Sequence, residues 1–242
     1  MITHQRFLTG LVLAAMCSAS YAETPAAGDE WEFKLTPYLW LAGISADTAS
    51  GGNDFPPINP DYSFFSLDNL DGAAFLSFAV TKGQWSVRSD LVYVSFADSK
   101  PDGLVAASFD LDGGTLELSA GYRPASWENT ELIFGLRGVK LSMDTVLTPG
   151  PSGSDSASFV DPIVGVRHQQ TFSNKWGVYA RGDLGAGSSE AMVNAELAGT
   201  YKFTDTFTLL FGYRYLEIDF DESDFLLDLS IQGYSLGFEF NW

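Results

Sequence analysis

The last nine residues of the chain, positions 234–242, read YSLGFEFNW. Large apolar side chains occupy every second position and end on Trp242, so a strand here would carry all of them on one face. In a soluble protein such a terminal strand needs a second layer packed against it. In an outer-membrane barrel the apolar face contacts lipid directly. The closing strand therefore predicts a membrane-spanning β-barrel.

The N-terminus predicts export across the inner membrane. Arg6 supplies a positive charge, residues 8–19 form a short apolar run, and a small-x-small cleavage site ends at Ala22. We therefore expect a signal peptide over residues 1–22, cleaved after Ala22, followed by one barrel domain over residues 23–242. The expected location is the outer membrane of a Gram-negative bacterium.

Alternation with period two recurs along the chain and gives about ten segments of the length of a tilted membrane strand. The segments are residues 31–45, 72–82, 85–98, 105–123, 130–143, 158–172, 175–188, 190–203, 206–220 and 225–242. Long connections, such as 46–71 and 144–157, alternate with short ones, as outer loops alternate with periplasmic turns in such barrels. The expected fold class is all-β: a closed antiparallel transmembrane β-barrel of about ten strands, with eight or twelve as alternatives.

Two features depart from simple alternation. In the last strand, Leu229 and Ile231 share one phase and the aromatic residues after Gly233 share the other, which predicts a β-bulge beside the glycine. The preceding strand changes phase in the same way after Tyr215. The long connection 46–71 is rich in proline, and we expect either an ordinary surface loop or a plug folded into the barrel.

If the aromatic phase faces lipid, the opposite phase lines the lumen, and it repeatedly contains Gly-x-Arg, at residues 121–123, 135–137, 165–167 and 212–214. Glycine and arginine two positions apart share a face, so the glycine is expected to leave space for the guanidinium group. The side chains predicted to line the lumen, as a candidate constriction, are Tyr38, Trp40, Arg88, Asp90, Glu117, Arg123, Arg137, Asp161, Arg167, Arg181, Asp183, Glu196 and Arg214.

Two interpretations of this inward set remain open. In a narrow lumen the balanced charges would pair as a salt-bridged core. Alternatively, the arginines and the acids would form separate walls of a constriction that selects small zwitterions or anions. Tyr38 and Trp40 would fill the lumen or offer a stacking surface to a solute.

Catalytic residues are not evident. A hydrolytic barrel enzyme usually needs a histidine as general base, and His168 is the single histidine after the predicted signal peptide. It falls on the lipid-facing phase, and the residues after it offer no triad. We expect a protein that is not an enzyme and has no catalytic residues.

The predicted outer loops are acidic, and the net charge of −18 argues against nucleic acid as a partner. Weak candidates for metal ligands are Asp219, Asp221, Glu222 and Asp224, which lack the glycine and distal glutamate of an EF-hand. We expect a solvated acidic rim and no cofactor. The alternative is that divalent cations at the extracellular loops bridge these acids to lipopolysaccharide phosphates.

Stretches along nearly the whole chain resemble a family of proteobacterial outer-membrane β-barrel proteins, the OmpA/OmpW-like and porin-like small barrels. These stretches are residues 31–44, 82–85, 90–93, 121–123, 161–167 and 212–216. The resemblance implies an outer-membrane barrel and brings no catalytic residues with it. Some relatives are associated with the passage of small or hydrophobic molecules.

The expected function is that of a non-enzymatic outer-membrane barrel, either structural or a narrow channel for small solutes. The alternative is an extracellular binding or adhesion module whose acidic loops engage a cation, a polysaccharide or a cell surface. The expected partners are outer-membrane lipid, lipopolysaccharide and the barrel-assembly machinery, which would recognise the C-terminal strand. We expect a monomer.

Overall fold

The computed structural model describes residues 30–50, 62–63, 70–100, 106–148, 150, 152–222 and 225–242. The predicted signal peptide lies outside the described residues, and so does most of the connection between residues 51 and 69. In the described part of the chain, no helix is long and apolar enough to cross a membrane.

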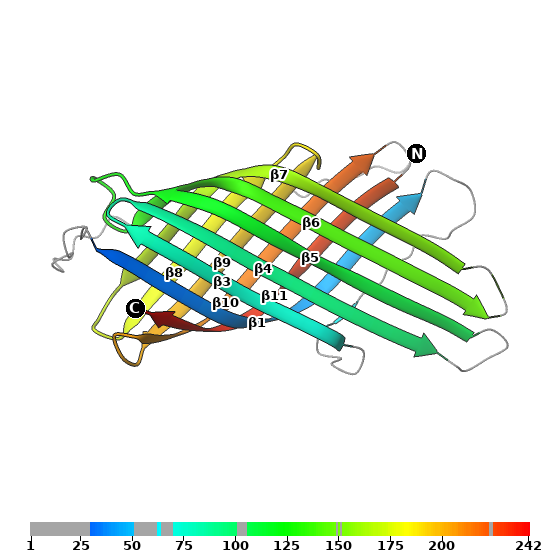
Figure 1. The fold of residues 1–242 in the computed structure, drawn as a ribbon, viewed down its shortest axis with the longest axis horizontal. Coiled ribbons are helices and arrows are strands. Elements are labelled where there is room, and N and C mark those ends of the chain that lie inside the picture. Colours follow the sequence, from blue (N-terminus) through cyan, green and yellow to red (C-terminus); the bar gives the residue numbers. More distant parts are fainter. Residues whose placement is uncertain are drawn as a thin grey trace, which may run out of the picture.

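Ten long antiparallel strands and one very short strand, β2, form the described fold (Figure 1). The strands are β1 (Trp31–Ser50), β2 (Tyr62–Ser63), β3 (Leu70–Lys82), β4 (Trp85–Lys100), β5 (Ala106–Tyr122), β6 (Thr130–Thr148), β7 (Ser152–Thr171), β8 (Trp176–Gly185), β9 (Ala191–Lys202), β10 (Phe207–Glu222) and β11 (Phe225–Asn241). Each long strand pairs with the next, and β11 pairs with β1 from Lys34↔Asn241 to Ser50↔Phe225. The sheet is closed, so the predicted ten-stranded antiparallel barrel is confirmed.

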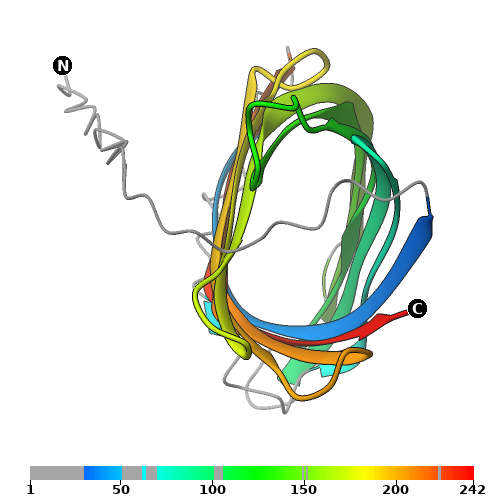
Figure 2. The ribbon, with the colours of Figure 1, turned by 90° about the vertical axis from the view of Figure 1, so that its left-hand side faces the viewer.

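The C-terminal residue pairs with the first strand at one end of the barrel. Trp242 and Phe33 exchange two backbone hydrogen bonds, of 2.9 and 3.1 Å. The short turns lie at the same end, among them the turn after Lys82, where Gly83 has a φ of 59° that glycine adopts without strain. Short turns mark the periplasmic end of such barrels. Figure 2 looks into the barrel from this end and shows an oval cross-section.

The distribution of polarity is the reverse of that in a soluble protein. Leu118, Val164 and Leu197 point outward and are about 60% exposed, at 59%, 64% and 61%, whereas Arg137 and Asp161 point inward and are 0% exposed. An outer surface of this kind is stable in lipid and not in water. The barrel therefore spans a membrane.

Aromatic side chains mark both edges of the lipid-facing band. Trp85 lies near the periplasmic turns, and Tyr93, eight positions further along β4, is exposed on the same face. At about 3.3 Å per residue and a tilt near 40°, the two are roughly 20 Å apart in height, close to the thickness of the apolar band of such barrels. Tyr213 and Tyr234 continue the outer edge on β10 and β11 and are in ring contact.

The predicted long loop at 144–157 is wrong. β6 runs to Thr148 and β7 begins at Ser152, and the two strands pair up to Val146↔Ser152. Serine, glycine and aspartate in this stretch suggested a loop, but each strand supplies the other with backbone hydrogen bonds, and this pairing overrides weak local preference.

The predicted β-bulge beside Gly233 is also wrong. β10 and β11 pair without a shift from Phe207↔Phe240 to Glu222↔Phe225, and β1 and β11 keep one register. The apolar side chains change phase because the lumen itself changes: toward the outer end, Leu216 and Leu229 are buried inside the barrel at positions where charged residues line it further down.

The first long connection touches the barrel wall at one described place. Tyr62 and Ser63 of β2 pair with Ile44 and Gly43 of β1, on the edge that β3 occupies lower down. This short segment therefore lies in the wall and extends it. The prediction that residues 46–71 plug the barrel rests on residues outside the described part.

Candidate functional site

The lumen is the candidate functional site, and its side chains form three levels. A charged layer crosses the middle of the barrel. An apolar layer covers it on the outer side, and a polar pocket lies on the periplasmic side. The levels follow from the sequence of the strands. In most strands, the next inward residue toward the outer end after a charged residue is apolar. Asp90 is followed by Val92, Arg137 by Val139, and Arg214 by Leu216.

Four side chains form the centre of the charged layer: Glu117 of β5, Arg137 of β6, and Arg181 and Asp183 of β8. Arg137 Nη2 donates to Glu117 Oε2 at 2.7 Å and to Asp183 Oδ1 at 2.8 Å. Arg181 Nη2 donates to both oxygens of Glu117 at 2.8 Å, and its Nε donates to Asp183 Oδ2 at 2.7 Å. Each acid thus faces two guanidinium groups, which compensates four charges that are almost fully buried.

This group of four extends across the lumen to the opposite wall. Asn194 Nδ2 donates to Asp183 at 2.8 Å, and the Asn194 amide oxygen accepts from Arg214 Nε at 3.1 Å. Arg214 Nη1 in turn donates to Asp90 at 3.2 Å and to the Tyr38 hydroxyl at 3.0 Å. Tyr38 donates to the Asp90 carboxylate at 3.1 Å. A continuous hydrogen-bonded chain therefore joins β5 and β6 to β1 and β4.

Trp40 connects the charged layer to the apolar layer above it. Its ring lies 4.9 Å from Arg214 Cζ, a cation–π contact, and the side chain is buried. The apolar layer contains Trp40, Ala42, Val92, Val139, Phe159, Met192, Leu216, Ile218 and Leu229. The sequence-based alternatives for Trp40 were filler or a stacking surface for a solute, and in the structure its neighbour is an arginine of the protein.

Asp161 is inward and fully buried but makes no ion pair with a described arginine. Its carboxylate accepts hydrogen bonds from the backbone N–H groups of Ser188 and Ser189 and from the Ser189 hydroxyl. Asp161 therefore fastens the connection between β8 and β9 to the outer end of the lumen wall, a role that the spacing of charges did not indicate.

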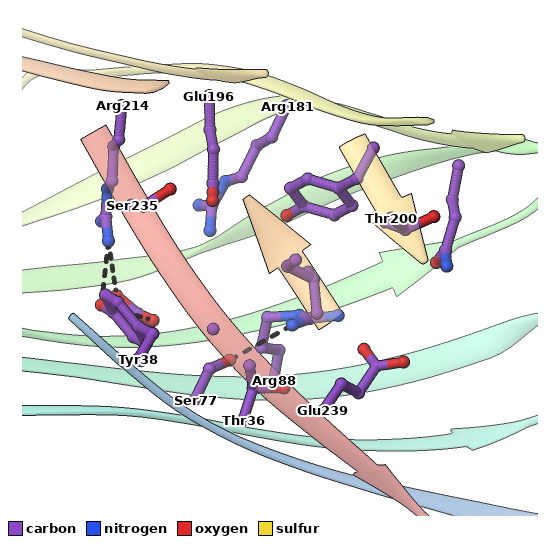
Figure 3. Close-up of a pocket in the computed structure, with 15 residues that line it drawn as sticks. Thr36, Tyr38, Ser77, Arg88, Arg181, Glu196, Thr200, Arg214, Ser235 and Glu239 are labelled. Atoms are coloured by element: carbon purple, nitrogen blue, oxygen red, sulfur yellow. Dashed lines mark hydrogen bonds and ion pairs between the residues drawn. The ribbon is translucent and has the colours of Figure 1, made fainter. Parts of the chain in front are cut away.

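The polar pocket on the periplasmic side is lined by Arg88, Glu196 and Glu239 among other residues, and Figure 3 shows their side chains converging on it. Arg88 donates to Ser77 Oγ at 3.2 Å, and Glu239 pairs with Lys34 at 3.4 Å. Glu196 lies between Arg181 and Arg214 in the register of β8, β9 and β10. With the solvent at its mouth, the pocket contains about 720 Å³ not filled by protein atoms.

A second cluster lies beside this pocket, where the chain enters β6. Glu131 accepts from Arg123 Nη2 at 3.0 Å through one oxygen and from Arg167 Nη1 at 2.9 Å through the other. The Ser86 hydroxyl also donates to Glu131. One carboxylate therefore serves two arginines.

The glycines of the Gly-x-Arg pattern do not make space for the guanidinium groups. A Cβ atom at Gly135, Gly165 or Gly212 would lie 2.2 to 2.3 Å from a backbone oxygen of the neighbouring strand. The close contacts are between strands, so these glycines allow the wall to bend sharply, as glycine does in curved sheets. The spatial reason predicted for the pattern is wrong at these three positions. At Gly121 a Cβ atom would meet side chains, Ser86 Oγ at 2.3 Å and Glu131 Oε2 at 3.1 Å, so this glycine leaves space for the carboxylate that holds the arginines.

Some lumen residues were missed by the sequence analysis. Asn194 carries the chain of hydrogen bonds across the lumen, Glu131 holds two arginines, and Met192 Sδ lies 3.3 Å from Arg137 Nη1. Asn194 shares the phase of Glu196, and Glu131 shares the phase of Arg137. Extending each inward phase along its strand would have found them.

No group of three or more residues that could hold a metal ion occurs within the described residues. Of the four weak metal candidates, Asp219 is exposed, whereas the side chains of Asp221 and Glu222, and all of Asp224, lie outside the described part. His168 is half-buried on the lipid-facing phase, and its Nδ1 lies 2.9 Å from Thr130 Oγ1. In the described part no carboxylate hydrogen-bonds to this ring.

Comparison with solved structures finds this fold among outer-membrane barrels. The outer membrane protease OmpT from Escherichia coli matches with a TM-score of 0.56 at 9% identity, over 91% of this chain and 99% of OmpT. Weaker matches include the translocator domain of autotransporter NalP from Neisseria meningitidis, with a TM-score of 0.44 at 12% identity over 88% of each chain. The attachment invasion locus protein Ail of Yersinia pestis matches with a TM-score of 0.39 at 9% identity, over 88% of this chain and 98% of Ail.

No protein-family model and no curated protein sequence matches the chain. The fold and the reversed polarity together define a transmembrane β-barrel of the outer-membrane type. At 9% identity, the likeness to OmpT concerns the fold alone. Membership of the OmpA/OmpW-like group stays an expectation from the sequence.

Proposed function

We propose that this chain is a non-enzymatic barrel of the Gram-negative outer membrane whose lumen is closed to solutes, so that its role is structural. The observation that carries the proposal is the hydrogen-bonded chain from Glu117 to Asp90, with the apolar layer directly above it. A solute would have to separate buried ion pairs and then pass a layer that offers no hydrogen bonds, and both steps are costly.

Planar-bilayer conductance tests this proposal. The refolded protein is expected to insert, as judged by heat-dependent gel mobility, and to give no stepwise openings under conditions in which a porin conducts. Openings that Arg137→Ala alters and Lys202→Ala leaves unchanged would overturn it in favour of a narrow channel. Lys202 is a suitable control because it pairs with the exposed Asp205 at the periplasmic rim, outside the charged layer that closes the lumen.

A second candidate function, binding at the cell surface, is supported by the length of β4 to β7 beyond the outer aromatic edge (Figure 1). β6 continues past Lys140 to Thr148, and its exposed outward residues there include Asp144. These strand ends would hold a surface above the membrane. Binding of intact cells to glycans or to other cells, compared with a variant carrying Asp110→Asn, Asp112→Asn and Asp144→Asn, tests this function; equal binding would reject these acids as the contact surface.

A further inference from the structure

Arg167 is a buried guanidinium group with too few partners. The residue is 4% exposed, and within the described part of the chain its engaged atom is Nη1, which donates to Glu131. Its Nε and Nη2 are buried and have no hydrogen-bond partner among the described residues. Unpaired buried donors on a charged group carry the full cost of lost hydration. A ligand that supplies acceptors here would relieve this cost.

Arg88 has the same deficiency on the other side of this region. Its Nη1 donates to the hydroxyl of Ser77, and its Nε is buried with no partner in the part of the chain that the structure describes. Among the described residues no carboxylate lies within ion-pair distance of Arg88. The Ser77 hydroxyl satisfies one donor but does not compensate the charge.

The positive charges of Arg88 and Arg167 act on each other. Ser86, two positions before Arg88 on the same face of β4, donates to Glu131, the carboxylate that holds Arg167, so the two arginines are close enough to repel each other. Arg181 adds to this repulsion and lies directly opposite Arg167 in the register of β7 and β8. Like charges in such positions are destabilising. Arg181 has two carboxylate partners of its own, which leaves Arg88 and Arg167 as the excess positive charge.

Three of the four nearby acids are paired with other cations. Asp90 pairs with Arg214, Glu239 pairs with Lys34, and Glu131 is shared between Arg167 and Arg123. Glu196 lies between Arg181 and Arg214 in the register. Asp90, Glu239 and Glu131 cannot neutralise Arg88 or Arg167 without abandoning another cation. Glu196 forms no ion pair with a described residue, so one carboxylate at most is available for the two arginines.

The periplasmic pocket reaches Arg88 and the neighbours of Arg167, although Arg167 itself is not among the residues that line it. Arg88 lines it directly (Figure 3), and so do Gln169 and Arg181, the neighbours of Arg167 on the same face of the wall. Water entering the pocket could accept hydrogen bonds from the free N–H groups. Water would not compensate their charge, whereas an oxyanion would do both, since guanidinium groups and oxyanions form charge-assisted, often bidentate hydrogen bonds.

We propose that Arg88 and Arg167 form a binding site for one small oxyanion, a phosphate or a carboxylate, which enters the lumen from the periplasmic side. The anion accepts from the Nε of Arg88 and from the Nε and Nη2 of Arg167, the donors that lack partners. This site is independent of whether the barrel conducts, because it lies below the charged layer that closes the lumen.

The test is the thermal stability of the refolded barrel in uncharged detergent, titrated with inorganic phosphate and, separately, with acetate, at constant pH and at an ionic strength held constant with chloride. A ligand that binds the folded state raises the melting temperature in proportion to the logarithm of its concentration above its Kd. We expect this behaviour with at least one of the two anions. Stabilisation by phosphate alone identifies a phosphate site, and stabilisation by acetate alone identifies a carboxylate site.

Variants separate a built site from general screening. Arg88→Gln is expected to weaken anion binding on the order of tenfold or more, because it removes charge-assisted hydrogen bonds. Lys175→Gln removes an exposed cation from a periplasmic turn, where its ammonium group lies over the ring of Tyr201, and is expected to leave binding unchanged. Equal stabilisation of all three proteins would overturn the proposal, as would no stabilisation of the unaltered protein by either anion. The second outcome decides the question even if Arg88→Gln does not fold.

Discussion

Replacing Glu117 with glutamine is expected to destabilise the barrel by about 3–5 kcal/mol, the usual cost of removing one partner from a buried ion pair. Glu117 accepts from Arg137 at 2.7 Å and from Arg181 at 2.8 Å, and its side chain is 1% exposed. The carboxamide of glutamine keeps one acceptor oxygen but turns an N–H group toward two guanidinium groups. Asp183 would then be the single remaining acid for both.

Urea unfolding in lipid vesicles, followed by tryptophan fluorescence and gel mobility, measures this loss. Asp205→Asn is the control, since it removes an exposed carboxylate whose partner is Lys202, and we expect no measurable change. The double variant Glu117→Gln, Arg137→Met removes the uncompensated charge together with its partner, and it is expected to regain much of the stability, as buried ion pairs replaced by apolar groups often do.

Two results would refute this reasoning. If Glu117→Gln unfolds within about 1 kcal/mol of the unaltered protein, the lumen is well hydrated and the network is not a buried core. If the double variant is no more stable than Glu117→Gln alone, the loss comes from packing and not from an unpaired charge.

Three further outcomes follow from the geometry. Gly212→Ala should cost about 1–3 kcal/mol in unfolding experiments, because its Cβ would lie 2.3 Å from the Leu197 carbonyl oxygen, whereas Gly182→Ala, with nothing within 4 Å, should cost little. Asp161→Ala removes the acceptor for Ser188 and Ser189, so protease added to intact cells should cut at residues 186–190 faster than in the exposed-site control Asp144→Ala. Lys202 lowers the pKa of Asp205 through a hydrogen bond and its charge. The contribution of this exposed pair to stability, too small to measure by unfolding, is present above the ordinary pKa of aspartate and is lost as the pH falls through the lowered value. An NMR titration in Lys202→Gln should return the pKa to its ordinary value, and an unchanged midpoint would contradict this.

The strand pattern could be predicted from the sequence because lipid imposes a simple rule. Every outward side chain in the membrane must be apolar, so the phase of Tyr234, Leu236 and Phe238 fixes the faces of β11, and the same rule applies to each strand in turn. The ten strands follow from it. Above the membrane the rule no longer applies, which is why the strand ends at Thr148 and Ser152 were mistaken for a loop.

The misplaced β-bulge has the same origin. A lumen that is polar throughout would require inward apolar residues such as Leu216 and Leu229 to change face, and the predicted bulge rests on that premise. A closed lumen needs only to be filled, and close packing fills it with charged pairs at one height and with aliphatic side chains at another. The alternation of apolar and polar residues along a strand therefore depends on what surrounds each face. It distinguishes the lipid-facing side from the lumen-facing side only where the lumen is polar.

Which charged side chains pair within the lumen depends on geometry that the alternation of residues along a strand does not encode. The period-two pattern indicates that Asp161 and Asp183 both face inward, yet one binds backbone N–H groups of the connection after β8 and the other binds two arginines. Which acid reaches which cation depends on strand register, tilt and the oval cross-section, which together set heights and distances across the barrel. The near balance of charge in the lumen conceals a local excess at Arg88 and Arg167, and that excess makes an anion a physically reasonable ligand for a barrel whose overall charge is strongly negative.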